Sequence, residues 1–149
     1  LPMRLLKLYV HAYQSHLWNE TAALLVLQGN VRKRVPYSKG VFVFSDYPLQ
    51  IDVPLIGFAT ELGGMNEDVA AIIKEIMEKE EIDFTDFVIK EIPRLSLEGG
   101  QRSLFAEIWD FSFSNLEEDE LNQGKKKVTV SFSLPKGAYA TMVVKRMFE

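Results

Sequence analysis

The chain has 149 residues, of which 47% are hydrophobic; it has no cysteine, and its formal net charge is −4 at pH 7. This length and composition fit one ordinary domain, or one and a half small ones, with enough apolar residues to fill a core. They exclude a disulfide framework and a thiolate metal site, and the acidic balance argues against a protein that binds nucleic acid over its whole surface.

Several common classes of segment have no counterpart in the sequence. There is no apolar run long enough to cross a membrane and no secretion leader, so we expect a cytoplasmic protein that does not contact membranes. His11 and His16 are not spaced as a zinc pair, and we expect no metal site. The chain opens with Leu1 rather than methionine, which suggests a piece of a longer protein.

The first predicted element is a long helix over residues 5–28, a stretch without proline or glycine in which good helix formers dominate. Pro2 suits the start of the helix, and Gly29-Asn30 is the expected C-terminal cap. Apolar residues cover most of the circumference, so we expect protein to surround the helix, and this chain is short of residues to do so.

Polar residues gather on one stripe of this helix, at spacings of three and four: Lys7, His11, Gln14, Ser15 and Asn19. The stripe is either an internal hydrogen-bond network or the wall of a site. A lone histidine such as His11 is more often a hydrogen-bonded core residue than a catalyst.

Residues 31–65 contain prolines and glycines that predict short strands and loops, with a strand over residues 40–44 and an extended edge segment over 51–58. Asn66 then caps a clear helix that ends near Glu81. Its predicted buried face consists of Val69, Ile72, Ile73, Ile76 and Met77. Asp83 is expected to cap a second short helix that reaches Val88 and finishes before Pro93.

The remaining predicted elements are two strands and a closing helix. Residues 102–113 are nearly apolar on both faces, which predicts a single central strand. The polar segment 114–127 should be an exposed connection to a strand over Val128–Leu134 that pairs with it antiparallel. Pro135 ends that strand, and a helix is expected from Ala138. We therefore predict an α+β fold with a mixed or antiparallel sheet and packed helices.

The turn before the closing helix has two interpretations. Gly137 supplies a small residue where the helix can begin, and backbone N–H groups at a helix start can bind an anion such as an RNA phosphate. The alternative is a strand–turn–helix that only packs.

Two basic clusters stand out against the acidic total, namely Arg32, Lys33 and Arg34, and Lys125, Lys126 and Lys127. The acidic run 117–120 lies close to the second cluster. Such clusters are solvated loops in most proteins and phosphate contacts in others. The usual catalytic signatures are absent: there is no G-x-S-x-G elbow, P-loop, G-x-G-x-x-G after a strand, or H-E-x-x-H.

Three blocks, in the same order, resemble the TruD family of tRNA pseudouridine synthases in its archaeal and eukaryotic branch. They are YVHAYQSHLWNETA at Tyr9–Ala22, IDVPLIGF at Ile51–Phe58, and FSLPKGAYATMVVKRMF at Phe132–Phe148. The last block, with its LPKG[AS]YAT core, is the most specific.

The resemblance implies an enzyme that isomerises a specific uridine of RNA, typically at position 13 of tRNA, to pseudouridine without cofactor or metal. It also implies a domain order in which residues 1–35 are a helix segment of the catalytic domain, 36–125 are the family's inserted α/β domain, and 126–149 return to the catalytic domain. Its partner in catalysis is tRNA.

The family's catalytic motifs are absent from this chain. The family uses an aspartate in a G-x-K-D-R-type motif and an aromatic residue in an N-x-F motif, and neither occurs here. We therefore expect no catalytic residue in this chain and an upstream catalytic portion of the same protein, which makes the chain alone inactive.

The resemblance instead implies supporting residues for the active-site cleft. These are His11, Gln14, Ser15 and Asn19 on the first helix, and Gly137, Tyr139, Ala140 and Thr141 at the closing turn. The expected RNA contacts are Arg32, Lys33, Arg34, Lys125, Lys126, Lys127 and Lys136. Two alternatives remain open, a non-catalytic RNA-binding module and a protein-interaction domain that uses the apolar side of the first helix.

Overall fold

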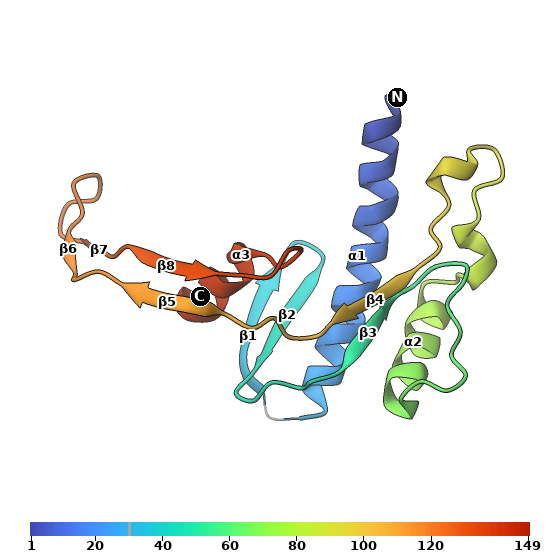
Figure 1. The fold of residues 1–149 in the computed structure, drawn as a ribbon, viewed down its shortest axis with the longest axis horizontal. Helices are drawn as coiled ribbons and strands as arrows, with labels where there is room; N and C mark the ends of the chain where they lie inside the picture. Colours follow the sequence, from blue (N-terminus) through green and yellow to red (C-terminus); the bar gives the residue numbers. More distant parts are fainter. Residues whose placement is uncertain (30) are drawn as a thin grey trace. The chain divides into compact units, whose positions relative to one another are not determined.

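The structure is a computed structural model that describes residues 1–29 and 31–149. Its backbone divides into a first unit, Leu1–Phe105, and a second unit, Ala106–Glu149. In the described residues, helices accompany two-stranded sheets whose pairings are all antiparallel (Figure 1). The predicted α+β class is confirmed.

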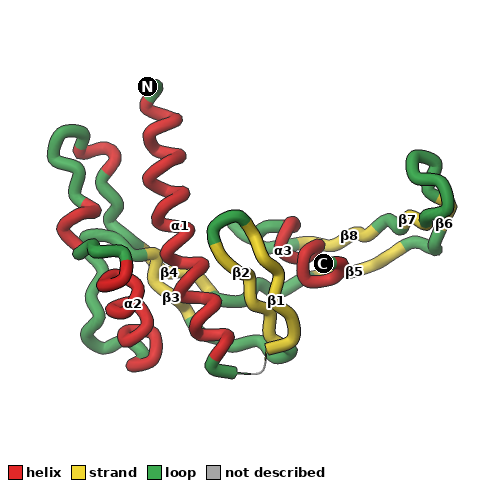
Figure 2. The backbone as a smooth tube through the Cα atoms, turned by 180° about the vertical axis from the view of Figure 1, so that it is seen from behind, coloured by secondary structure: helices red, strands yellow, loops and turns green. Residues whose placement is uncertain are grey.

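The first unit is built around its long N-terminal helix. Its elements are, in chain order, α1 (Met3–Leu27), β1 (Val31–Tyr37), β2 (Gly40–Ser45), β3 (Asp52–Leu55), α2 (Glu67–Lys79), the 3-10 helices η1 (Phe84–Phe87) and η2 (Pro93–Leu95), and β4 (Gly100–Ser103). β1 pairs with β2, and β3 pairs with β4. Figure 2 shows the C-terminal half of α1 between the β1–β2 hairpin and the β3–β4 pair.

Helix α1 starts two residues earlier than predicted, at Met3. The carbonyl of Pro2 accepts hydrogen bonds from the N–H groups of Leu5 and Leu6, at 2.9 and 3.2 Å, which begins the helix there. The helix ends at Leu27 with Gln28 as its C-cap. Asn30, part of the predicted cap, lies outside the described residues.

Within the described chain, protein covers α1 more completely over its C-terminal half than over its N-terminal half. Leu17 and Thr21 have no exposed surface, whereas Leu8 and Tyr9 in the N-terminal half are 61% and 57% exposed. The prediction of a helix surrounded by protein therefore holds for one half of α1. In the N-terminal half, Val10 packs against the core, whereas Leu8 and Tyr9 stay largely exposed.

Helix α2 confirms the predicted helix and its buried face. The side chain of Asn66 accepts hydrogen bonds from the N–H groups of Asp68 and Val69, at 3.0 and 3.2 Å. The helix ends at Lys79, earlier than expected, and Glu81 adopts a positive φ of 55° that a helix does not tolerate. The core joins the five predicted residues of α2 with Leu17, Leu25, Val53, Ile56, Phe87 and Leu97.

The short predicted elements of the first unit are also present. Strands β2 and β3 match the predicted strand and extended segment. The predicted second short helix is η1, where the carboxylate of Asp83 accepts from the N–H of Thr85 at 2.6 Å.

The prediction of one central strand over residues 102–113 is wrong. The structure has two strands there, β4 in the first unit and β5 (Trp109–Phe113) in the second, and all five residues of β5 are exposed. The apolar run crosses the boundary between the units after Phe105, and each part pairs with a different strand. Apolar residues on both faces therefore do not indicate burial on both faces here.

The second unit is an antiparallel ribbon followed by a helix. Its elements are β5, β6 (Glu117–Glu118), β7 (Lys126–Lys127), β8 (Val130–Ser133) and α3 (Ala140–Phe148). β5 pairs with β8, as predicted, and β6 pairs with β7 within the segment expected to be a plain connection. Asp110 has a φ of 53° at a bulge in β5, and its carboxylate accepts from the Ser133 hydroxyl at 3.1 Å.

Candidate functional site

Two side chains of α1 bind the backbone of β3 and the residue that follows it. The amide nitrogen of Gln14 donates to the carbonyl of Ile56 at 2.9 Å, and Gln14 itself is 6% exposed. One turn further on, the indole N–H of Trp18 donates to the carbonyl of Val53 at 3.1 Å. These bonds join the backbone of β3 and of the next residue to α1, so they fix this segment against the helix.

Strand β4 completes this arrangement through Arg102. Its guanidinium carbon lies 5.2 Å from the centroid of the Trp18 ring, a cation–π contact. Arg102 pairs with Val53 in the β3–β4 register, so one indole ring contacts both strands. The helix face with Gln14 and Trp18 is therefore a structural wall rather than a surface free to bind a ligand.

The loop after β3 approaches the segment before β4 very closely. The N–H of Phe58 donates to the carbonyl of Leu97 at 2.8 Å, and the N–H of Ala59 donates to the carbonyl of Glu98 at 3.0 Å. A Cβ atom on Gly57 would overlap the backbone of residues 97–99. Glycine at this position is therefore a packing requirement.

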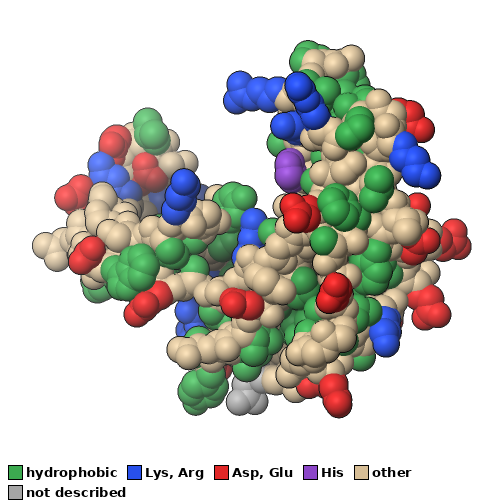
Figure 3. Space-filling model, turned by 45° about the vertical axis from the view of Figure 1, so that its right-hand side comes forward, with side chains coloured by type: hydrophobic (Ala, Val, Ile, Leu, Met, Phe, Trp, Pro, Cys, Tyr) green, Lys and Arg blue, Asp and Glu red, His purple; other side chains and the backbone are tan. Residues whose placement is uncertain are grey.

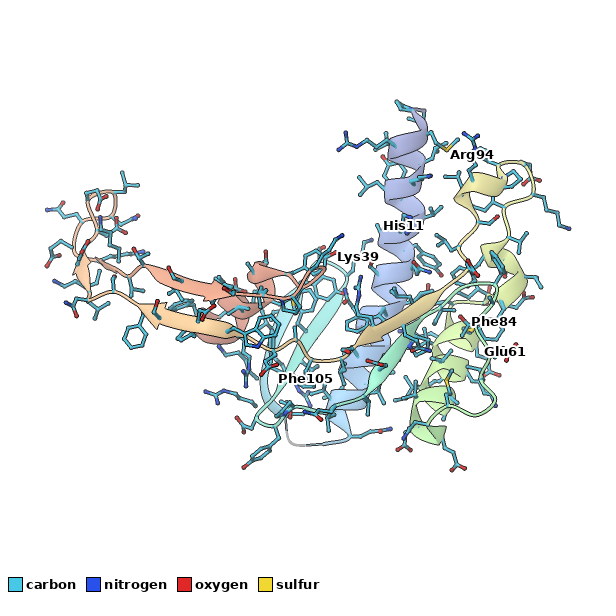
Figure 4. All side chains as sticks on the ribbon, viewed as in Figure 1. His11, Lys39, Glu61, Phe84, Arg94 and Phe105 are labelled. Carbon is cyan, nitrogen blue, oxygen red and sulfur yellow. The ribbon has the colours of Figure 1, made fainter. Side chains whose placement is uncertain are left out.

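The predicted polar stripe of α1 includes exposed, half-buried and buried side chains. Lys7 and His11 are exposed, Ser15 and Asn19 are half-buried, and Gln14 is buried. Figure 4 labels His11 on the N-terminal half of α1. Of the two interpretations of the stripe, the internal hydrogen-bond network applies to Gln14. It does not apply to Lys7 and His11, which are exposed.

The first basic cluster lies on a strand, and the interpretation as a solvated loop is wrong. Arg32, Lys33 and Arg34 are part of β1, which pairs with β2. Arg32 and Arg34 are exposed, and Arg32 forms an ion pair of 3.0 Å with Asp46. A strand can present alternate side chains to solvent, which is why a basic run is compatible with it.

The second basic cluster is paired with the acidic run on the β6–β7 hairpin. Lys126 forms an ion pair with Glu118, and Lys127 forms one of 2.5 Å with Glu120. The hydrogen bond from Lys127 lowers the pKa of the exposed Glu120. Exposed pairs of this kind contribute little to stability. Figure 3 shows cationic and anionic side chains interspersed over the face in view.

The closing turn presents its residues to solvent. Gly137 has a φ of 93°, and the N–H of Ala138 donates to the carbonyl of Pro135 at 3.1 Å, so glycine is needed for the turn itself. Lys136 and Tyr139 are exposed, as are Ala140 and Thr141 in the first turn of α3. Val143 is the buried residue of this helix.

The predicted supporting residues fall into two groups, and each group is brought together by its own element. His11, Gln14, Ser15 and Asn19 share α1 in the first unit. Gly137, Tyr139, Ala140 and Thr141 share the closing turn and α3 in the second unit.

Tyr13 makes a polar contact that the sequence did not predict. Its hydroxyl donates to a carboxylate oxygen of Glu80 at 3.2 Å, across 67 residues of sequence. Burial, followed by the charge of Glu80, raises the pKa of Tyr13. The available signal was the spacing of Tyr9 and Tyr13, which places two aromatic rings one helical turn apart.

The described residues have neither a membrane-spanning helix nor a cluster of metal-ligating side chains. None of their helices combines the length and the apolar character needed to cross a membrane. No group of three histidine, aspartate or glutamate side chains among them is arranged to hold a metal ion.

Comparison with known proteins identifies the family. The family model for tRNA pseudouridine synthase D (TruD) matches residues 42–147. The Methanococcus maripaludis protein designated tRNA pseudouridine synthase D 1 is 34% identical over 97% of this chain and 39% of its own length. The corresponding protein of Methanopyrus kandleri is 31% identical over 99% of this chain and 33% of its own length.

A solved structure shows the same similarity. The crystal structure of the Methanosarcina mazei protein assigned to tRNA pseudouridine synthase D (TruD) matches with a TM-score of 0.69 and 27% identity. The match covers 97% of this chain and 38% of that one. The chain thus spans less than half the length of the relatives it matches. On the extent of the family-model match and these similarities, the chain belongs to the TruD family.

Proposed function

We propose that this chain is the C-terminal portion of a tRNA pseudouridine synthase that isomerises uridine, typically at position 13, in tRNA. Membership of the TruD family is the observation that carries this proposal. The isomerisation breaks the bond from N1 of the base to C1′ of the ribose and forms a bond from C5 to the same carbon, while C5 loses its proton and N1 gains one. No atom is gained or lost, and the chemistry depends on groups that hold the base and ribose in place.

The catalytic aspartate is proposed to lie upstream of Leu1. Two observations support this: the family's G-x-K-D-R-type and N-x-F motifs are absent from the sequence, and relatives such as the M. maripaludis protein are matched over only 39% of their length. Within this chain we assign residues 1–35 and 126–149 to the catalytic domain and 36–125 to the inserted domain. Gln14 and Trp18 then tie the catalytic-domain helix to the inserted domain.

The role proposed for the two groups of supporting residues, on α1 and at the closing turn, is to support the active-site cleft. On α1, Gln14 positions the helix while His11, Ser15 and Asn19 remain at least partly accessible. At the closing turn, Gly137 sets the backbone and Tyr139, Ala140 and Thr141 face solvent. Such residues act on geometry, so their substitution should alter turnover without removing the chemistry.

The cations are proposed to contact tRNA phosphates and to position the RNA without reading its sequence. They are Arg32, Lys33, Arg34, Lys125, Lys126, Lys127 and Lys136, and all but the half-buried Lys33 are exposed. A cytoplasmic location and tRNA as the partner complete the proposal.

The test uses the full-length protein and an unmodified tRNA transcript. Pseudouridine is mapped by carbodiimide labelling and primer extension, with a transcript that carries cytidine at the target position as the control. We expect one modified uridine, at position 13 or its structural equivalent. Absence of pseudouridine at every position, with protein shown to be folded, would contradict the proposed function.

A further inference from the structure

The first unit contains a groove between the N-terminal half of α1 and residues 82–97. Its volume is about 240 Å³, and its lining includes Tyr9, Val10, Tyr13, Asp86, Phe87 and Leu97. Pockets for drug-sized ligands run from about 300 to 1,000 Å³. This groove is therefore sized for a single ring system.

The groove has aromatic walls and an apolar floor. Tyr9 and Tyr13 stand one turn apart on α1 and are 57% and 38% exposed, so their rings remain available. Phe87 and Leu97, which also line the groove, are buried, at 6% and 7% exposure. Exposed aromatic rings over an apolar floor are the surfaces on which unpaired bases stack in RNA-binding proteins.

Three polar side chains line the groove, and the hydrogen bonds of two of them, Asp86 and Tyr13, leave oxygen acceptors. One carboxylate oxygen of Asp86 accepts from the N–H of Asp83 at 2.8 Å, which fixes the side chain and leaves the second oxygen as an acceptor. The Tyr13 hydroxyl gives its proton to Glu80 and keeps its oxygen lone pairs. A ligand that contacts the free oxygen of Asp86 therefore brings an N–H donor, and the exposed Tyr9 carries a hydroxyl that can donate or accept.

Two cations lie on residues 82–97, the segment that forms one side of the groove. Lys90 directly follows the groove residue Ile89, and Arg94 belongs to η2, which contacts α1 (Figure 4). Both are exposed, and no ion pair involves either of them among the described residues. The Asp86 carboxylate repels a phosphate from the groove itself. The phosphate therefore belongs beside the groove, and the base belongs within it.

We infer that this groove binds one unpaired nucleobase that carries an exocyclic amino group, with the adjoining phosphates near Lys90 and Arg94. The amino groups of cytosine, adenine and guanine can donate to the free oxygen of Asp86. Uracil offers one N–H flanked by two carbonyl oxygens, which the carboxylate repels. The inference rests on the proposed function, because tRNA is taken as the source of the base.

The test observes the groove directly in the full-length protein. Methyl-labelled protein is titrated with cytidine and uridine 5′-monophosphate, and NMR shifts are followed at Ile82, Ile89 and Leu97. Stacking on Tyr9 should shift these methyl signals, and cytidine monophosphate should bind about tenfold more tightly than the uridine nucleotide, the effect of one well-placed hydrogen bond. Methyl signals that respond to neither nucleotide would overturn the inference, including the case where a protein side chain is the true occupant.

Variants separate stacking from base choice. Tyr9→Ala should weaken binding of both nucleotides, whereas Tyr9→Phe, which keeps the ring, should bind as the natural protein does. Asp86→Asn adds an amide donor and should remove most of the preference for cytidine. Tyr47→Ala, at a residue 68% exposed and outside the groove, is the matched control and should change nothing. An unchanged preference in Asp86→Asn would overturn the inference.

A second readout keeps this inference apart from the proposed function. The same protein preparation is assayed for pseudouridine in a tRNA transcript. If pseudouridine forms but the methyl signals of the groove do not shift, only the groove inference is contradicted. If the methyl signals of the groove shift but no pseudouridine forms, only the proposed function is contradicted.

Discussion

At the scale of single residues, Gln14 shows how one side chain can fix two distant segments. Its amide bonds the carbonyl of Ile56 in a buried position. Gln14→Leu leaves that carbonyl unsatisfied, and we expect the free energy of unfolding to fall by about 1–3 kcal/mol. Urea denaturation measures the change, with the exposed Gln50→Leu as the control. A loss equal to that of the control would contradict the assigned role.

Gly57 allows a controlled prediction, because the same substitution can be made at a second glycine, Gly63, that has open space around it. A Cβ on Gly57 would overlap the backbone of residues 97–99, whereas a Cβ on Gly63 would meet open space. Gly57→Ala should lower the free energy of unfolding by about 1–3 kcal/mol or more, and Gly63→Ala should be close to neutral. Equal urea midpoints for the two variants would show that the close approach is not present.

Tyr13 and Tyr37 predict how stability depends on alkaline pH. Burial raises the pKa of both phenols above the ordinary 10.0, with further contributions from Glu80 for Tyr13 and Glu20 for Tyr37. The folded state then holds these protons more tightly than the unfolded state, so their stabilisation is complete below about pH 10 and is lost as pH rises through the folded pKa.

The measurement is urea unfolding at several values between about pH 9 and 11.5. Tyr13→Phe removes one raised pKa, so its stability should fall less steeply above pH 10 than that of the natural chain. Tyr47→Phe, at a highly exposed tyrosine, should follow the natural chain. Identical slopes for Tyr13→Phe and the natural chain would refute the assignment.

At the scale of elements, α2 depends on the cap that precedes it. Asn66 accepts hydrogen bonds from two N–H groups of the first turn. Asn66→Ala should lower the free energy of unfolding by about 1 kcal/mol, and Asn66→Asp should retain most of the stability. Thermal and urea unfolding check both variants. An unchanged free energy of unfolding in Asn66→Ala would mean that the cap contributes nothing.

The elements also show what can be predicted from sequence and what is hidden. Helix α2 was predictable because its signals are local: the Asn66 cap and the spacing of Val69, Ile72 and Ile76 suffice. The division of residues 100–113 into β4 and β5 was hidden, because an alternating apolar run looks the same in one strand or in two. Strand β1 was hidden because a basic cluster dominates its composition.

The candidate site, too, could be predicted from the sequence only in part. The resemblance of sequence blocks singled out Gln14, and the structure gives it a partner in another block. The contact of Tyr13 with Glu80 joins residues 67 apart in sequence, and no local pattern indicates which distant carboxylate a tyrosine will meet. Side-chain partners of this kind follow from tertiary packing, which a pattern of residue types does not specify.

At the scale of the whole molecule, the two basic clusters predict how RNA binding responds to salt. In the full-length protein, Lys125→Gln/Lys126→Gln/Lys127→Gln should reduce the slope of log affinity against log salt by about 1 for each lysine that contacts phosphate. Lys74→Gln/Lys79→Gln on α2 is the control. An unchanged slope in the triple variant would remove these lysines from the RNA interface.

The central claim is that this chain is one portion of a tRNA pseudouridine synthase whose catalytic aspartate lies upstream. The most direct measurement maps pseudouridine in tRNA from cells that lack the gene, after return of either the full-length gene or the segment for these 149 residues. We predict that the modification disappears on deletion, returns with the full-length gene, and does not return with the segment alone. Pseudouridine restored by the segment alone, or unaffected by the deletion, would contradict the account.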